Sequence, residues 1–203
     1  MGHATAPGQI VILNGAPRSG KTSIVRAIQE TLDGLWMNVG VDAARMMTPP
    51  RAQPGIGLRP GEATHPAAPF VPLLYAALYE SVAAHSRLGL NVVVDVGHHD
   101  RDVLTDSAER LAGLPVLFVG VHCPIDVVME RRRSSEPGSY AVAAVDEPIP
   151  PPVLRWQSEV HGGWAYDLEV DASVQGPEKC AAAIGRRLAA TEPADAFERL
   201  AKR

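Results

Sequence analysis

A short apolar run leads directly into a glycine-rich loop in the segment Gln9-Ile-Val-Ile-Leu-Asn-Gly-Ala-Pro-Arg-Ser-Gly-Lys-Thr22. The β-branched residues before Gly15 are typical of a buried parallel strand. From Lys21 to Leu32 apolar residues recur at helical spacing, so a helix is expected directly after the loop. The sequence predicts a phosphate-binding loop, because a loop of the form Gly-x-x-x-x-Gly-Lys-Thr lies between a predicted strand and a predicted helix.

This loop has the residue types that hold a triphosphate. Its glycines allow several backbone N–H groups to point at phosphate oxygens, and the helix N-terminus adds a favourable dipole. We expect Lys21 to reach the β- and γ-phosphates and to act in catalysis, and Thr22 to offer its hydroxyl to Mg²⁺. The alternative is that the glycines only allow the backbone to turn and that the loop binds no phosphate. The expected nucleotide-binding residues are Gly15, Ala16, Pro17, Arg18, Ser19, Gly20, Lys21, Thr22 and Ser23.

Strand and helix patterns alternate along the rest of the chain. Further strands are expected at 35–41, 90–95, 115–121 and 166–171, and helices at 70–88, 101–112, 124–133 and 177–190. This alternation predicts an α/β fold in three layers, a parallel sheet of about five strands with helices on both faces, in a single domain, 1–203.

Two stretches rich in proline and small residues interrupt the alternation. One predicts an acceptor-side loop at about 43–69, and the other predicts a lid region at about 131–160 that includes an irregular stretch at 134–152. Long loops in compact domains are often functional. At the end of the chain, residues 192–203 fit either a short amphipathic helix or a frayed terminus.

Two carboxylates are expected at the edge of the sheet that carries the phosphate-binding loop. Asp95 ends an apolar strand, so it is expected at the carboxyl edge, where it would orient Mg²⁺ and contact the substrates. Asp42 ends the run 35–41 and would accept the proton of an acceptor hydroxyl, or orient that hydroxyl, during attack on a γ-phosphate. The alternative for each is a structural cap of the following segment.

Cationic and aromatic residues supply further candidates. Arg131, Arg132 and Arg133 close a predicted helix before the irregular stretch, where a guanidinium would neutralise charge on a transferred phosphoryl group. A solvated helix end explains the same three arginines. His98 and His99 follow the Asp95 strand and are expected either to contact the acceptor or to be ordinary loop residues. Weaker candidates for an apolar acceptor wall are His65, Phe70, Trp156 and Trp164.

Composition excludes several classes of partner. The formal charge of −4 gives no basic footprint for nucleic acid. Cys123 and Cys180 form neither a disulfide framework nor a zinc signature and are expected as buried thiols. No apolar run approaches the length of a membrane span, and the first residues lack a leader pattern, so a cytoplasmic protein without a membrane partner is expected. The oligomeric state is open, a homo-oligomer included.

Taken together, these residues resemble the chloramphenicol phosphotransferase family. The matching segments include Gly40-Val-Asp42, Val92-Val-Val-Asp95, Val119-Gly-Val-His-Cys123 and Tyr166-Asp-Leu-Glu-Val-Asp171. The resemblance implies a nucleoside-monophosphate-kinase-like fold and a resistance kinase that phosphorylates a hydroxyl of an antibiotic, with Asp42 as the base. We therefore predict an ATP- or GTP-dependent phosphotransferase that requires Mg²⁺.

Two departures from the family pattern lie on the acceptor side. The family often has a second aspartate after the Asp95 position, where this chain has Val96. The family's lid arginines would fall near Ser135 and Gly138, so they are either lost or replaced by Arg132 or Arg133, which become the catalytic candidates. Both departures predict an acceptor other than chloramphenicol, such as another antibiotic or a nucleoside-like natural product.

Two other functions use similar residues. A metabolic kinase for a sugar, a shikimate-like acid or a nucleotide would have the same loop and the same carboxylates, and only its acceptor would differ. A nucleotide-binding regulatory hydrolase is the second alternative. The chain lacks the Asn-Lys-x-Asp segment expected of a switch-type GTPase, which argues against that alternative but not against GTP as a donor.

Overall fold

The computed structural model describes residues 6–53, 68–134 and 148–202. Five parallel strands form one sheet in the order β2-β3-β1-β4-β5. This arrangement confirms the predicted α/β architecture. The strands are β1 Ile10–Asn14, β2 Trp36–Asn38, β3 Asn91–Val96, β4 Val116–His122 and β5 Leu168–Asp171.

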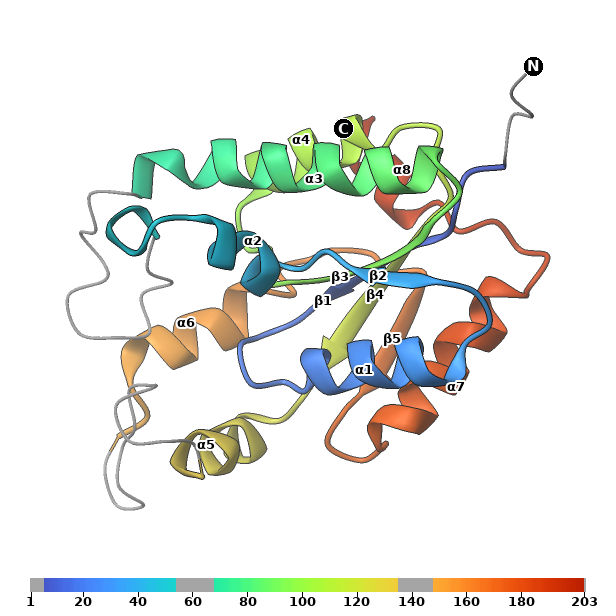
Figure 1. Ribbon diagram of the computed structural model, residues 1–203. Helices are drawn as coiled ribbons and strands as arrows, with labels where there is room; N and C mark the ends of the chain where they lie inside the picture. Colours follow the sequence, from blue (N-terminus) through green and yellow to red (C-terminus); the bar gives the residue numbers. More distant parts are fainter. Residues whose placement is uncertain (1–5, 54–67, 135–147, 203) are drawn as a thin grey trace.

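Helices cover both faces of this sheet (Figure 1). The helices α3, α4 and α8 lie on one face, α1 and α7 lie on the other, and α5 and α6 lie beyond the carboxyl ends of the strands. The α-helices are α1 Lys21–Thr31, α2 Val41–Met47, α3 Val71–Arg87, α4 Arg101–Arg110, α5 Ile125–Arg133, α6 Pro151–Glu159, α7 Pro177–Leu188 and α8 Ala196–Ala201. Short 3-10 turns at Pro50–Ala52 and Ala68–Phe70 flank the undescribed part of the predicted acceptor-side loop.

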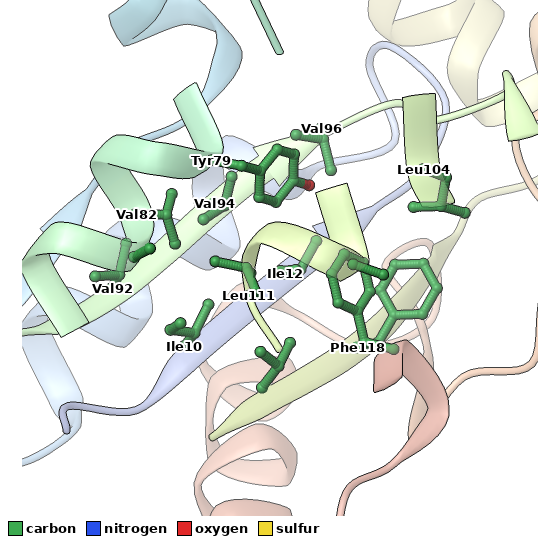
Figure 2. Close-up of a cluster of buried hydrophobic side chains, with 14 of the residues drawn as sticks. Ile10, Ile12, Tyr79, Val82, Val92, Val94, Val96, Leu104, Leu111 and Phe118 are labelled. Atoms are coloured by element: carbon green, nitrogen blue, oxygen red, sulfur yellow. The ribbon is translucent and has the colours of Figure 1, made fainter. Parts of the chain in front are cut away.

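The alternation of side chains along β1 divides the core into two clusters. Ile10 and Ile12 face α3, α4 and α8 and pack with residues such as Tyr79 and Phe118 (Figure 2). Val11 and Leu13 face the opposite layer, where they pack against α1 and α7. Because β1 is buried on both faces, it reads in sequence as a continuous apolar run, and it holds the loop that follows it at the centre of the sheet.

Two segments differ from the sequence predictions. The strand predicted at 35–41 is only Trp36–Asn38, and Asp42 lies in the first turn of α2 instead of at a strand end. Pro151–Glu159 forms α6, although its first two residues were expected in the irregular stretch 134–152. Prolines suit the first turn of a helix because the N–H that they lack has no helical partner there. Among the described residues, no helix is long and apolar enough to cross a membrane.

Candidate active site

The phosphate-binding loop joins the buried strand β1 to the N-terminus of α1, as its sequence predicts. Gly20 has a φ of 107°, a left-handed conformation that favours glycine. Gly15 approaches the neighbouring strand so closely that a Cβ atom would lie 2.5 Å from the Val121 carbonyl oxygen. No side chain caps α1, and its first turn carries no acid. The first N–H groups of α1 are therefore suited to bind an anion.

Lys21 is held against the loop that precedes it. Its Nζ donates hydrogen bonds to the carbonyl oxygens of Gly15, at 2.8 Å, and Ala16, at 2.9 Å. Burial lowers the pKa of Lys21 to about 8, and the charges of Asp95 and Asp42 oppose this lowering. The lysine therefore lies within electrostatic reach of both predicted carboxylates.

Asp95 is bonded to the first helical turn after the loop. The Thr22 hydroxyl donates to Asp95 Oδ2 at 3.0 Å, and Asp95 is only 8% exposed. Burial raises the pKa of Asp95, whereas the Lys21 charge and the Thr22 hydrogen bond lower it. Gly40 packs against this carboxylate, and a Cβ atom on Gly40 would lie 1.7 Å from Asp95 Oδ1. The pair of oxygen donors is of the kind that Mg²⁺ prefers.

Asp42 reaches the same site from α2. It lies at the second residue of the helix, after Gly40 as the cap, and its side chain is exposed to the cavity. The cavity has a volume of about 450 Å³. Its lining residues are Gly15, Pro17, Arg18, Gly20, Lys21, Thr22, Ser23, Ile24, Val41, Asp42, Tyr75, Asp95, Val96, Gly97, Arg131, Trp156, Ala172, Gln175 and Pro177. Two acids and one lysine thus surround a single cavity.

Of the three neighbouring arginines, Arg131 is the one that lines the cavity. Its Nη1 donates to the Ser19 carbonyl oxygen at 2.8 Å and to that of Arg18 at 3.2 Å, while its Nη2 donates to the Ala172 carbonyl oxygen at 2.8 Å. Arg132 is 1% exposed and Arg133 is exposed, and neither lines the described part of the cavity. Catalytic roles for Arg132 and Arg133 stay predictions, whereas Arg131 braces the phosphate-binding loop.

His98 and His99, which were expected either to contact the acceptor or to be ordinary loop residues, are not among the described lining residues of the cavity. His98 is 2% exposed, and its Nε2 pairs with the Tyr79 hydroxyl at 2.7 Å. Its backbone N–H donates to Asn14 Oδ1 at 2.7 Å. Burial lowers the pKa of His98 to about 3, so the ring is neutral. His99 makes an edge contact with Trp156, at 4.6 Å between ring centroids.

Of the four weaker candidates for the acceptor wall, Trp156 lines the cavity. Phe70 is 55% exposed, and Trp164 packs beneath Arg101, with 4.9 Å from the guanidinium carbon to the ring centroid. Neither of them is among the described lining residues. His65 lies outside the described residues.

The sequence predictions missed several of the residues that line the cavity, and Tyr75, Gly97 and Gln175 are among them. Tyr75 is one turn before Tyr79 on α3, so helical spacing places both on the face that packs toward the sheet. Gly97 directly follows β3. A small residue directly after a parallel strand lies at the edge of the sheet where ligands bind, so its position in the sequence could have indicated the cavity. No local pattern distinguishes Gln175.

Other proteins are similar to this chain in sequence and in structure. Two proteins of Mycobacterium tuberculosis that carry the provisional name O-phosphotransferase are each 26% identical over 214 residues, which covers 97% of this chain and 89% of theirs. The structure of the tunicamycin resistance protein of Deinococcus radiodurans is similar, with a TM-score of 0.57 and 20% identity over 91% of this chain and 97% of that one.

P-loop kinases have the same fold. The Mycobacterium tuberculosis APS kinase CysC matches with a TM-score of 0.61 and 15% identity, over 91% of this chain and 99% of its own. The shikimate kinase of Aquifex aeolicus matches with a TM-score of 0.59 and 15% identity, over 89% and 96%. These similarities confirm the predicted P-loop kinase fold.

Residues 8–189 match the model of a protein family that is described as "chloramphenicol phosphotransferase-like protein". The match includes the phosphate-binding loop, both carboxylates and the last strand, which are the segments that carry the resemblance in the sequence. It also confirms the predicted enzyme class, a phosphotransferase. The chain therefore belongs to the chloramphenicol phosphotransferase-like family.

Proposed function

We propose that this phosphotransferase moves the γ-phosphoryl group of ATP or GTP onto a hydroxyl of a small antibiotic, as a means of self-resistance. The observation that carries the proposal is the placement of Asp42 and Asp95 on one cavity with Lys21 and Thr22. One acid is bonded to the threonine of the phosphate-binding loop, and the other is exposed to the cavity. This division suits a donor site beside an acceptor site.

In the proposed reaction, the acceptor oxygen attacks the γ-phosphorus. The bond between that phosphorus and the β–γ bridging oxygen breaks, the nucleoside diphosphate leaves, and the hydroxyl proton passes to the Asp42 carboxylate. Lys21 neutralises negative charge on the phosphates, and the backbone N–H groups of the loop hold the donor. Arg131 keeps the loop in position through its bonds to two loop carbonyls.

The oxygen donors of Thr22 and Asp95 fit Mg²⁺, because they lie 3.0 Å apart beside the phosphate-binding loop and provide the hard ligands that this ion prefers. When bound, Mg²⁺ would supply positive charge to the phosphate oxygens. Asp95 itself is held in place by close packing on Gly40 and by the Thr22 hydroxyl.

An antibiotic acceptor is supported by the family's description and by a neighbour named for tunicamycin resistance. The changes at Val96 and in the lid sequence favour an acceptor other than chloramphenicol, and a nucleoside-type compound is our first candidate. The protein would then inactivate the compound by adding a phosphate to one of its hydroxyls.

The test is a panel of hydroxyl-bearing antibiotics, nucleoside-type compounds and chloramphenicol included, incubated with ATP or GTP and Mg²⁺ and analysed for a mass gain of one phosphate. We expect transfer to at least one antibiotic other than chloramphenicol, and none with Lys21→Ala. Rapid turnover of chloramphenicol alone would overturn the choice of acceptor. Donor hydrolysis that no acceptor changes, and that Asp42→Ala leaves intact, would instead favour a regulatory hydrolase.

A further inference from the structure

Asn14 is the last residue of β1, where the strand enters the phosphate-binding loop, and its side chain is fully buried, with 0% exposed. It is not among the described residues that line the cavity, so the structure does not indicate a direct contact with either substrate. Burying an amide side chain is costly unless its polar atoms are hydrogen-bonded. The hydrogen bonds of Asn14 therefore indicate what this residue does.

The main-chain pairing between β1 and β3 changes directly after Asn14. The Gly15 N–H donates to the Val96 carbonyl oxygen at 3.2 Å. In a regular parallel ladder, a residue that donates to residue j of its partner strand accepts from residue j+2, so the Gly15 carbonyl oxygen would accept from the His98 N–H. Instead, the His98 N–H donates to Asn14 Oδ1 at 2.7 Å. The side chain of Asn14 thus replaces a main-chain acceptor.

The Gly15 carbonyl oxygen, which does not accept from His98, holds Lys21. The Nζ atom of Lys21 donates to this oxygen at 2.8 Å. If the same oxygen also accepted the His98 N–H, its lone pairs would be shared between two donors. Asn14 therefore helps to place Lys21 at the start of the loop before a donor binds.

The amide of Asn14 is itself fixed on its other side. Its Nδ2 donates to the Val160 carbonyl oxygen at 2.9 Å and to the Tyr166 hydroxyl at 3.0 Å. Val160 is the C-cap of α6, where carbonyl groups have no partner within the helix. Because both hydrogens of Nδ2 are used, the amide is oriented with Oδ1 toward His98. One side chain thus links β1, the segment after β3 and the end of α6.

We propose that Asn14 is a positioning residue of the phosphotransferase, which holds the start of the phosphate-binding loop in register with the segment that follows Asp95. That segment, 96–98, leaves the carboxylate directly, so its bond to Asn14 fixes the chain on the far side of Asp95. Lys21 and Asp95 then line one cavity before the donor arrives. Groups that are already ordered lose less free energy when a ligand binds. This role is at the donor end and does not depend on the identity of the acceptor.

The first experiment measures the Kd of a non-hydrolysable analogue of ATP or GTP with Mg²⁺ by calorimetric titration, without an acceptor and well below the Tm of each variant. Asn14→Ala removes the whole amide, and we expect the donor Kd to rise about tenfold because Lys21 and Asp95 are no longer held in register. An unchanged donor Kd in folded Asn14→Ala would overturn the proposal. The absence of transfer to any acceptor would overturn the proposed function and leave this result standing.

Two polar side chains at the opposite edge of the sheet provide matched controls. Asn91 Oδ1 accepts the Gln9 N–H at 3.0 Å across the same two strands, and Ser86, which is 0% exposed, donates to the Gly8 carbonyl oxygen at 2.7 Å. Asn91→Ala and Ser86→Ala are expected to lower the Tm and to keep the donor Kd within about twofold of the wild type, since they lie away from the cavity. If these controls raised the donor Kd as much as Asn14→Ala, loss of stability alone would explain the effect and the positioning role would be wrong.

Tyr166→Phe tests the same role if Asn14→Ala does not fold. It removes a hydroxyl that Asn14 Nδ2 bonds and keeps the ring, which lies 4.6 Å from the Phe118 ring between centroids. Because the Val160 carbonyl still accepts from Asn14, we expect a smaller rise in the donor Kd, about threefold. His161→Phe removes the other side-chain partner of this hydroxyl and is expected to leave the donor Kd unchanged. An unchanged donor Kd in Tyr166→Phe, or an equal rise in His161→Phe, would overturn the role of Asn14.

Discussion

Replacing Gly40 by alanine would place a methyl group 1.7 Å from Asp95 Oδ1. Gly40 has φ −86° and ψ 175°, which suit any residue, so the substitution acts by crowding and not by backbone strain. The carboxylate must then move by about 1 Å or more, because packed interiors leave no such overlap. The hydrogen bond from Thr22 to Asp95, 3.0 Å long, is expected to break.

A displacement of about 1 Å in a catalytic group costs about 100-fold in rate. We therefore expect kcat of Gly40→Ala to fall about 100-fold, or about 2.7 kcal/mol in activation free energy, and the Mg²⁺ concentration needed for half-maximal rate to rise. The assay is steady-state phosphoryl transfer at saturating donor and acceptor over a range of Mg²⁺ concentrations, with circular dichroism to verify folding.

Gly176→Ala is the matched control for Gly40→Ala. Gly176 also caps a helix, with φ −65° and ψ 162°, but the atom nearest to an added Cβ is Glu178 Oε2 at 3.4 Å, an ordinary contact. We expect its kcat to stay within about twofold of the wild type, since no active-site group must move. A folded Gly40→Ala enzyme with wild-type kcat and wild-type Mg²⁺ dependence would refute the reasoning about Asp95.

Two further predictions concern the donor end. Because its pKa is about 8, Lys21 loses its proton above that pH. Donor affinity should therefore be constant from pH 6 to 7.5 and fall about tenfold per pH unit well above pH 8. Calorimetric titration with a non-hydrolysable donor measures this affinity, and a constant affinity up to pH 10 would contradict the prediction. Arg131→Lys keeps the positive charge but loses the guanidinium hydrogen bonds to the carbonyl oxygens of Arg18, Ser19 and Ala172. The donor KM should therefore rise about tenfold while the acceptor KM is unchanged. An unchanged donor KM would show that these hydrogen bonds are not needed for donor binding.

Local sequence signals predicted the phosphate-binding loop and the strands around it. Their information lies within a few residues, as in the run before Gly15 and the helical spacing after Lys21. The ends of elements were less predictable. Val39-Gly-Val-Asp42 has a strand-like composition, but Gly40 caps α2, whose later residues are good helix formers. The prolines before Val153 read as irregular, yet two of them begin α6.

Side-chain roles that depend on distant contacts could not be predicted from the sequence. His98 was expected either to contact the acceptor or to be an ordinary loop residue, and the structure buries it, with its polar groups bonded to Tyr79 and Asn14, which are far away in the chain. From the sequence, Arg131 could not be distinguished from Arg132 and Arg133. In the structure its guanidinium donates a hydrogen bond to the Ser19 carbonyl oxygen. These outcomes depend on which helix face packs on the sheet, and tertiary packing decides that beyond local propensity.

The most direct test of the account is the effect of Asp42→Asn on turnover and on donor binding, measured on the same protein preparation. Asparagine keeps the size of the side chain but cannot accept the hydroxyl proton as a base. We expect kcat on the best acceptor to fall by about 100-fold or more, the usual contribution of general base catalysis, and the donor Kd to change less than about threefold. Near-normal turnover by Asp42→Asn would contradict the proposed role of Asp42.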